Sequence, residues 1–250
     1  MLEVCGITQR FGGITALEDI SFTMAKGDIT GVIGPNGAGK TTLFNIVTGL
    51  YSQTCGQIFL EGNDISRFPA EQLAGRGLVR TFQNIELFGT MTVLENVMVG
   101  LHTRSRCGIL SCMGKLPWHL SEERRIRTRA MEWLEFCGIT DLAHQVAGSL
   151  PFGQGRLLEI ARAMAVEPRI MLMDEPAAGL NNRETNELAV LIRRIRGTGV
   201  TIALVEHDME LVMDICDRIV VLNLGKKLAE GTPREIQENP AVIAAYLGEG

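Results

Sequence analysis

The sequence predicts an α/β fold with a mostly parallel sheet, and three observations indicate it. A glycine-rich loop at 34–41 separates a short apolar run at 29–33 from a segment at 40–50 whose apolar residues have helical spacing. A further apolar run at 170–173 has the pattern of a central parallel strand that is covered on both faces, and 200–205 reads as a third strand. Strands that alternate with helices form one α/β unit, and 250 residues are enough for it to bury a sizeable core.

Composition and charge exclude several classes of protein. The formal net charge of -5 and the pI of about 5.5 argue against a nucleic-acid partner, because nucleic-acid-binding domains usually carry a basic face. No apolar run approaches the thickness of a bilayer, and the first residues do not resemble a signal peptide, so we expect a cytosolic protein unless a partner tethers it to a membrane. Six cysteines without a C-x-x-C pair predict reduced thiols, and Cys107 and Cys112 are the only close pair.

Residues 34–41 read Gly-Pro-Asn-Gly-Ala-Gly-Lys-Thr and match the phosphate-binding pattern G-x-x-x-x-G-K-[ST]. An accidental match has a probability on the order of 1% in a chain of this length. The glycines let successive N–H groups point at phosphate oxygens at the start of the following helix, where the helix dipole favours anions. The residues predicted to hold the phosphates are Asn36, Gly37, Ala38, Gly39, Lys40, Thr41 and Thr42.

The chemistry of a nucleoside triphosphate gives two of these residues separate roles. Lys40 is expected to reach the β- and γ-phosphates, and the Thr41 hydroxyl is expected to ligate a Mg²⁺ ion that bridges them. By itself the loop leaves kinases, GTPases and motor proteins open. The turns that follow the later strands narrow this choice.

Acidic residues follow the strand at 170–173. Asp174 and Glu175 come at the C-terminal end of a buried strand, which is where ligands bind in open α/β sheets. Beside a phosphate loop, Asp174 is expected to hold Mg²⁺ through water, and Glu175 to polarise the water that attacks the γ-phosphate. His207 follows the strand at 200–205 and can hydrogen-bond the γ-phosphate from the same edge. The alternatives are a surface acidic turn and a structural histidine.

These motifs, in this order, resemble the nucleotide-binding subunit of an ABC transporter over essentially the whole chain. Residues 80–83 (Arg-Thr-Phe-Gln) resemble the family's Q-loop, residues 150–154 (Leu-Pro-Phe-Gly-Gln) occupy the signature position, and residues 177–181 look like the D-loop. The resemblance implies that Gln83 completes the magnesium and water site, that His207 is the switch histidine, and that Phe11 stacks on adenine. It also implies that Gly153 and Gln154 contact the nucleotide of a second subunit.

Two departures from the family pattern concern the contact with that second subunit. The usual L-S-G-G-Q is L-P-F-G-Q here, so Pro151 lacks the hydroxyl and the N–H of a serine, while Gly153 keeps its amide donor. Asn181 stands where an aspartate is commoner, which removes a charge. The segments at 157–162, 174–181, 205–209 and 245–249 are similar to branched-chain amino-acid importer ATPases of the LivG type.

The resemblance implies a P-loop NTPase fold: a RecA-like core with a mostly parallel sheet, an N-terminal antiparallel β subdomain and an inserted helical subdomain. Residues 1–250 then form a single ABC ATPase domain, with the core and β subdomain at 1–86 and 156–250 and the helical subdomain, including the signature, at about 87–155. The implied cofactors are ATP and Mg²⁺. The implied partners are a second, homologous ATPase subunit, two transmembrane permease subunits and, indirectly, a solute-binding protein. Through the permease subunits the chain is expected at the cytoplasmic face of the inner membrane.

Three alternatives stay open at this point. The same subfamily resembles ATPases that serve importers of urea or aromatic acids. A soluble ABC ATPase that acts on DNA or ribosomes is a rival, although such proteins generally carry a long coiled coil, zinc modules or two cassettes, which this sequence lacks. A nucleotide-binding regulator without hydrolysis is another rival, against which Gln83, Glu175 and His207 argue.

The rest of the chain predicts further elements. Helices are expected from about 91 and from a capping box that opens at Ser121, with a loop-like insert at 100–120. A strand at 218–224 precedes a helix capped by Thr232, with proline in its first turn. The arginines at 124, 125, 127 and 129 form either a solvated face balanced by Glu122 and Glu123, or a contact with lipid headgroups or a permease loop.

Overall fold

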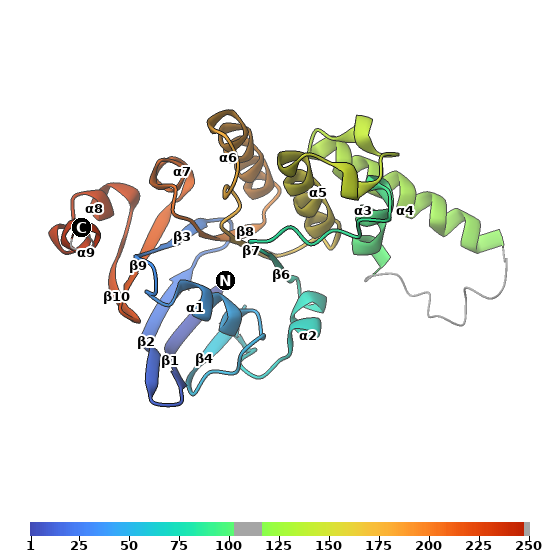
Figure 1. The fold of residues 1–250 in the computed structure, drawn as a ribbon. Coiled ribbons are helices and arrows are strands. Elements are labelled where there is room, and N and C mark those ends of the chain that lie inside the picture. The colour runs from blue at the N-terminus through green and yellow to red at the C-terminus, as the bar shows by residue number, and fades with distance from the viewer. Residues whose placement is uncertain (103–116, 248–250) are drawn as a thin grey trace. The chain divides into compact units, whose positions relative to one another are not determined.

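The computed structural model describes the backbone of residues 1–102 and 117–247, and the side chains of residues 1–101 and 122–246 (Figure 1). The chain divides into two compact units. One unit consists of Met1–Arg80 and Arg169–Gly250, and the other of Thr81–Pro168. The subdomain boundaries near 87 and 155 stay a prediction.

The first unit contains two sheets. The smaller sheet is antiparallel and has the strand order β2-β1-β4-β5, and the larger has the order β10-β9-β3-β8-β7-β6. In the larger sheet β3 pairs in parallel with β8 and β9, and β7 with β8, whereas β10 is antiparallel to β9. The predicted mostly parallel core and N-terminal antiparallel sheet are therefore confirmed. The strands are β1 (Leu2–Phe11), β2 (Ile14–Met24), β3 (Ile29–Ile33), β4 (Cys55–Leu60), β5 (Asn63–Asp64), β6 (Leu78–Thr81), β7 (Ile170–Asp174), β8 (Thr201–Val205), β9 (Arg218–Asn223) and β10 (Lys226–Gly231).

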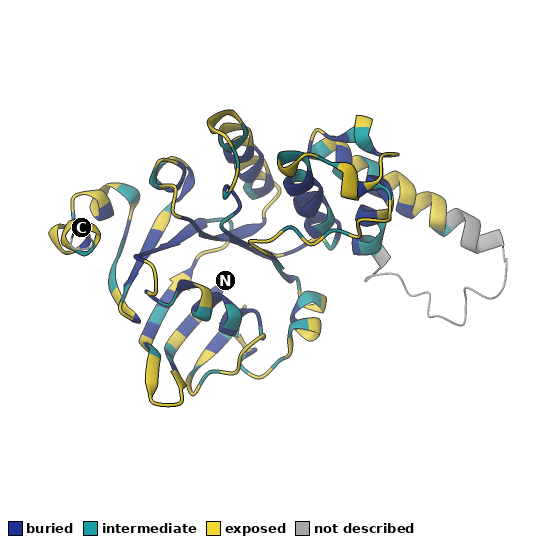
Figure 2. Ribbon diagram, viewed as in Figure 1, coloured by how far each residue is buried: buried dark blue, intermediate teal, exposed yellow. Residues whose placement is uncertain are grey.

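The central strands of the larger sheet are apolar because both of their faces are covered. Every residue of β3, β7 and β8 is buried, as the dark blue strands in Figure 2 show. Parallel pairing places Asp174 beside Val205, so the ends of β7 and β8 lie at the same edge as the end of β3. The loops that follow these three strands must therefore meet at that edge.

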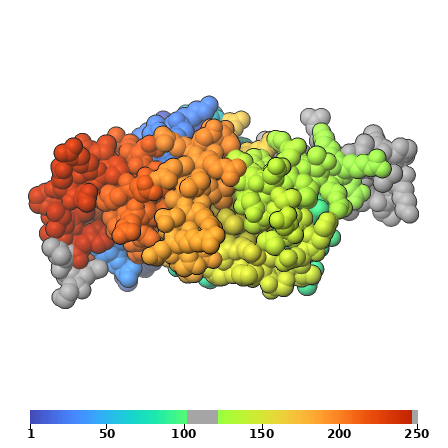
Figure 3. Space-filling view, turned by 90° about the horizontal axis from the view of Figure 1, so that it is seen from above, coloured from blue at the N-terminus to red at the C-terminus, as the bar shows by residue number. Residues whose placement is uncertain are grey.

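Helices of the first unit cover the larger sheet, and α6 and α7 form much of the surface seen from above, in orange in Figure 3. Helix α6 begins with a capping box in which Asn181 accepts from the N–H of Glu184 and the Glu184 carboxylate accepts from the N–H of Asn181. The capping box predicted at Thr232 is confirmed at the start of α8. The helices of this unit are α1 (Lys40–Val47), α2 (Ala70–Gly75), α6 (Asn182–Gly197), α7 (Met209–Ile215), α8 (Pro233–Gln237) and α9 (Pro240–Leu247).

The second unit is helical. Helices α3 (Val93–His102), α4 (Pro117–Phe136) and α5 (Phe152–Ala165) pack against one another. Their contact is apolar, since Val97, Ala130 and Leu158 are fully buried on the three helices. Short 3-10 turns at Thr140–Leu142 and Ala147–Ser149 connect α4 to α5.

Three predicted boundaries need correction. Helix α1 ends at Val47 rather than 50, because the N–H of Leu50 turns back to the carbonyl of Asn45 and breaks the helical pattern. Helix α4 begins at Pro117, so Ser121 lies inside the helix and cannot be its cap; proline tolerates the first helical turn, where its missing N–H costs nothing. Strand β9 ends at Asn223, and Leu224 has a positive φ of 48° in the turn that follows.

The predicted helix near 91 begins at Val93. Its cap is Thr92, whose N–H donates to the Glu95 carboxylate at 2.7 Å and whose hydroxyl accepts from the N–H of Glu95 at 3.2 Å. Most of the predicted insert at 100–120, with Cys107 and Cys112, lies outside the described residues. In the part of the chain that the structure describes, no helix combines the length and apolar character needed to cross a membrane.

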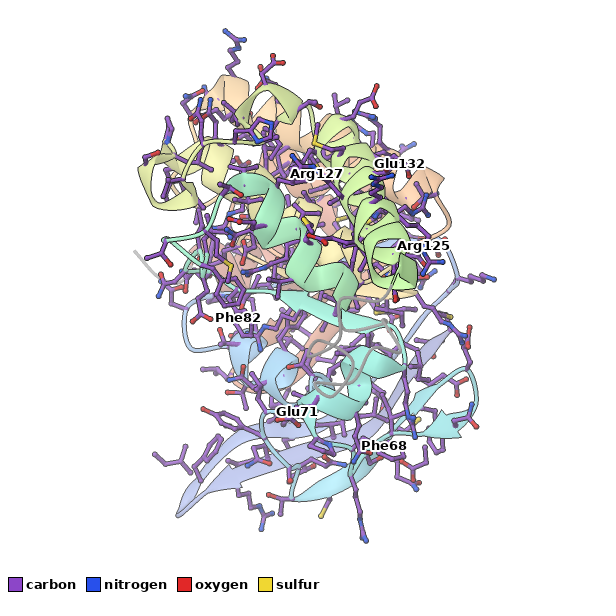
Figure 4. The ribbon with its side chains drawn as sticks, turned by 90° about the vertical axis from the view of Figure 1, so that its right-hand side faces the viewer. Phe68, Glu71, Phe82, Arg125, Arg127 and Glu132 are labelled. Atoms are coloured by element: carbon purple, nitrogen blue, oxygen red, sulfur yellow. The ribbon has the colours of Figure 1, made fainter. Side chains whose placement is uncertain are left out.

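The arginines of α4 are exposed, and two of them form ion pairs. Arg125 lies 4.0 Å from Glu122, while Arg129 contacts Glu132 at 2.8 Å and Glu167 at 3.3 Å. Figure 4 shows Arg125, Arg127 and Glu132 along this helix. Acidic neighbours thus balance part of the run, although Glu132 and Glu167 take the place predicted for Glu123. A contact with lipid or permease stays a prediction.

Candidate functional site

A pocket of about 460 Å³ lies at the edge of the larger sheet where β3, β7 and β8 end. Its size is typical of small-molecule sites. It brings together all seven residues predicted to hold the phosphates, 36–42, with Glu175 and His207, which are 133 or more positions further along the chain. The lining residues are Ile14, Thr15, Ala16, Asn36, Gly37, Ala38, Gly39, Lys40, Thr41, Thr42, Glu175, His207, Leu224 and Gly225.

Two glycines give the phosphate loop its path. A Cβ at Gly34, where φ is 151°, would overlap the carbonyl oxygen of Leu222 on β9. Gly39 is the residue before α1, with φ of 101°, and a Cβ there would lie 2.6 Å from a methyl carbon of Leu17 on β2. The loop can therefore lie against both strands only with glycine at these positions, and a turn of this kind before a helix allows its N–H groups to face an anion.

The ammonium of Lys40 lies inside the loop. Lys40 is 6% exposed, and its Nζ donates to the carbonyl oxygens of Gly34 at 2.6 Å and Pro35 at 3.0 Å. Both acceptors are neutral. The loop thus holds a positive charge beside the first turn of α1, which suits a polyanionic ligand.

Glu175 and His207 are in direct contact. Oε1 of Glu175 lies 3.0 Å from Nε2 of His207, and the glutamate side chain is 18% exposed while the imidazole is 46% exposed. The backbone of Glu175 has a φ of 47°, and its N–H donates to the carbonyl of Val205. A positive φ is costly for a residue with a side chain and is typical of functional sites. It turns the carboxylate out of the strand direction toward the pocket.

Asp174 is held by an arginine from the neighbouring strand. Its Oδ2 accepts from Arg80 at 2.5 Å, and Arg80 also donates to the Asn45 side chain at 2.6 Å and to the Thr48 hydroxyl at 3.3 Å. The residues expected to hold Mg²⁺ in this unit, Thr41 and Asp174, supply a hydroxyl and a carboxylate. This is the oxygen chemistry that Mg²⁺ prefers, with phosphate and water as its other ligands, so the donor set fits the ion.

Phe11 is not among the residues that line the pocket. It is half-exposed at the end of β1, and its ring packs edge-on against Tyr51 with centroids 5.8 Å apart. Its cross-strand partner on β2 is Ile14, which does line the pocket. Phe11 therefore lies one strand away from the pocket wall.

Gln83, Gly153 and Gln154 belong to the second unit. Gly153 and Gln154 lie in the first turn of α5, directly after Pro151, where backbone N–H groups have no partner within the helix. The buried guanidinium of Arg156 donates to the carbonyl of Gln83 at 2.8 Å. Within this unit, the Q-loop backbone is thus fastened to the signature helix.

A buried ion pair completes this attachment. Arg156 contacts Glu159 at 2.6 Å and donates to the carbonyl of Phe82, while Glu159 accepts from the N–H of Phe82 at 3.2 Å. Burial raises the pKa of Glu159 above its usual range, and the charge of Arg156 acts in the opposite direction.

Sequence reasoning missed four charged residues that organise the site. The side chain of each is more than nine-tenths buried, and each bonds to a segment distant in sequence. Position beside a motif is the only sequence signal that could have found them. They are Arg80, Arg156, Glu159 and Glu206.

Comparison with known proteins agrees with the geometry. Residues 17–178 match the family model described as ABC transporter, and residues 226–250 match the model described as branched-chain amino acid ATP-binding cassette transporter. The chain is 48% identical to the high-affinity branched-chain amino acid transport ATP-binding protein BraF of Pseudomonas aeruginosa and 47% identical to LivG of Salmonella typhimurium, which is described by the same words. Both alignments cover 100% of this chain and 98% of the relative.

The fold has counterparts among solved structures. A crystal structure of an ATP-binding cassette of an ABC transporter, in its ADP conformation, superposes with a TM-score of 0.86 at 31% identity. The match covers 99% of this chain and 98% of the other. The similarity thus extends over both units of the chain.

Proposed function

This chain belongs to the ABC transporter family, among its branched-chain amino acid ATP-binding proteins, and from that membership we propose that it hydrolyses ATP to power solute import. The solute class is branched-chain or related amino acids, carried by a membrane permease. One observation carries the proposal: a single pocket joins phosphate-loop residues 36–42 to a glutamate–histidine pair 3.0 Å apart. The relatives' names supply the solute class.

ATP binding follows from the loop. The β- and γ-phosphates accept hydrogen bonds from the N–H groups of 36–42, and Lys40 exchanges the carbonyls of Gly34 and Pro35 for phosphate oxygens. Adenine extends from the pocket past Ile14 and stacks on Phe11, which lies beside Ile14 on the neighbouring strand.

Hydrolysis uses the glutamate–histidine pair. The Glu175 carboxylate orients a water and accepts its proton as the oxygen attacks the γ-phosphorus, and the bond to the β-phosphate oxygen breaks to give ADP and phosphate. His207 lies against the carboxylate through Nε2, and an N–H of its imidazole donates to the γ-phosphate when ATP is bound. The family resemblance assigns Gln83 of the Q-loop to the same water.

Thr41 and Asp174 would hold Mg²⁺ in the first unit, and the family resemblance adds Gln83 of the second unit as a ligand. When bound, the ion neutralises charge on the β- and γ-phosphate oxygens. Arg80 fixes the Asp174 carboxylate through Oδ2, so one oxygen faces a defined direction before any ligand arrives.

A second ATPase subunit completes the site. Gly153 and Gln154 stand at the start of α5, where N–H groups and the helix dipole favour an anion, and they contact the γ-phosphate bound by the partner subunit. Pro151 contributes no N–H to this contact. The partner is a homologous chain rather than an identical one, and the pair closes on ATP and opens after hydrolysis.

The assembled transporter holds this subunit at the cytoplasmic face of the inner membrane, bound to two permease subunits. A solute-binding protein acts indirectly, by delivering solute to the permease. Specificity resides in those partners, so a related importer for urea or aromatic acids is the alternative cargo class for the same ATPase.

The test is ATP turnover by the purified complex of both ATPase subunits and the permease in lipid vesicles. We expect turnover that rises when binding protein loaded with leucine, isoleucine or valine is added. Binding protein loaded with urea or phenylalanine serves as the cargo control. Absence of turnover in the wild-type complex contradicts the proposed function.

Glu175→Gln, in the same complex, should retain ATP binding and lower turnover by about 100-fold or more, because it removes the proton acceptor. Glu187→Gln is the matched control, since Glu187 is exposed on α6, where it pairs with the surface residue Arg183. Near-normal turnover by Glu175→Gln removes Glu175 from this role.

A further inference from the structure

Glu206 is a buried carboxylate between β8 and the exposed His207. It is 4% exposed and lies in the first unit at the edge of the sheet that carries the phosphate loop. A carboxylate in such a place costs free energy unless hydrogen bonds satisfy both of its oxygens. The hydrogen-bond partners of Glu206 therefore indicate its role.

The two oxygens of Glu206 bind two different loops. Oε1 accepts from the N–H of Ala177 at 2.7 Å, in the loop that follows β7. Oε2 accepts from the N–H of His207 at 3.0 Å and, at 3.5 Å, from that of Asp208, in the loop that follows β8. One side chain thus joins segments 29 positions apart in sequence.

Each of these loops supplies one member of the catalytic pair. Glu175 stands two residues before Ala177, and His207 directly follows Glu206. Because Glu175 Oε1 lies 3.0 Å from His207 Nε2, the contacts close into a ring that runs through Ala177, Glu206 and His207. The ring also fixes the positive φ of Glu175, a conformation that persists only where surrounding contacts over-determine it.

A carboxylate suits this position better than its amide. The two loops require one hydrogen-bond acceptor each, and the carboxylate of Glu206 supplies both. A glutamine side chain offers one carbonyl oxygen and one NH₂ donor. Burial raises the pKa of Glu206, helped by the charge of Glu175, while the N–H groups of Ala177, His207 and Asp208 act in the opposite direction. The free-energy cost of burying this carboxyl group is thus offset by its hydrogen bonds to both loops.

We propose that Glu206 is a positioning residue that sets the distance between Glu175 and His207 by holding both of their loops through one carboxylate. The inference rests on the proposed function, since it assigns Glu206 to the same hydrolytic site. It further means that a displacement of 177–181, the segment expected to face the second subunit, reaches His207 through Glu206.

The test is Glu206→Gln in the reconstituted complex, with kcat and the KM for ATP measured separately. The variant keeps the shape but can accept from only one loop, so we expect kcat to fall about 10-fold or more while KM stays within about 2-fold. Glu235→Gln is the matched control: its carboxylate also accepts a backbone N–H, from Thr232 at 2.7 Å, but in the cap of α8, and its kcat should match the wild type.

Two results overturn the inference. The first is a kcat for Glu206→Gln within 2-fold of the wild type. The second is an equal fall in kcat for Glu206→Gln and Glu235→Gln when both variants lose the same thermal stability. ATP turnover by the wild-type complex tests only the proposed function, whereas the difference between the wild type and Glu206→Gln tests this inference. Failure of one is therefore distinguishable from failure of the other.

If Glu206→Gln does not fold, Glu206→Asp keeps both oxygens but is one methylene too short to reach both loops. Amide hydrogen exchange then reads the two contacts directly: we expect faster exchange at Ala177 or His207, together with the fall in kcat. Unchanged exchange at both amides, or unchanged kcat, overturns the inference as well.

Discussion

The guanidinium of Arg80 lies 2.5 Å from the carboxylate of Asp174, and both side chains are more than nine-tenths buried. Arg80 also reaches Asn45 and Thr48 near the end of α1. One arginine thus joins the helix that follows the phosphate loop to the strand that ends in the acidic pair. The position of Asp174 relative to the loop is therefore built into the core and does not depend on a ligand.

Replacing Arg80 by leucine should be strongly destabilising, because it leaves the buried Asp174 charge without its arginine. We expect the free energy of unfolding to fall by about 3–5 kcal/mol. Urea denaturation followed by circular dichroism measures this change, provided that the slope with urea stays constant. The double variant Arg80→Leu/Asp174→Asn, which removes the buried charge as well, should recover part of the loss.

Arg183→Leu is the control for that experiment, since Arg183 and Glu187 form an ion pair that is largely exposed on α6. Its cost should be below about 0.5 kcal/mol. If Arg80→Leu costs no more than this control, the buried pair does not organise the site as described.

Local patterns predicted the parts of the site that depend on neighbours in sequence. The phosphate loop needs a strand before it and a helix after it, and β3 and α1 supply them. Glu175 and His207 could be assigned to one edge because both follow largely apolar strands, and parallel strands end together. The cap at Thr232 was equally local.

Contacts between distant residues could not be predicted in this way. Arg80 and Asp174 are 94 positions apart, and Glu206 and Ala177 are 29 apart, so no periodicity or motif connects them. The prediction that Ser121 caps a helix is wrong although the local sequence matches a capping box, because α4 begins earlier, at Pro117. A capping box marks a helix start only where no helical residues precede it.

The path of the phosphate loop past β9 gives a second prediction. Gly34→Ala places a methyl group against the carbonyl of Leu222, whereas Gly12→Ala, also at a positive φ, has open space around its Cβ. Both should lose about 1–2 kcal/mol from the left-handed backbone, and Gly34→Ala should lose about 1–3 kcal/mol more through overpacking. Equal unfolding free energies for the two variants in urea contradict the close contact.

The thiol of Cys216 gives a prediction of pH dependence. Burial, with smaller contributions from Asp217 and Glu206, raises its pKa from 9.0 to about 12. Above pH 9 the unfolded chain therefore loses the proton while the folded chain keeps it, so stability falls as pH rises. Between pH 8 and pH 10 this single group should cost about 1.4 kcal/mol of unfolding free energy.

Cys216→Ala isolates this effect, because its lost packing is independent of pH. We expect the variant to be less stable than the wild type at pH 8 and the gap to narrow by about 1.4 kcal/mol at pH 10, measured by urea denaturation at both values. A gap that stays constant means that the thiol ionises equally in both states. That result contradicts the burial of Cys216 between β3 and α7, where its Sγ stands 3.0 Å from the position of a Cβ on Gly31.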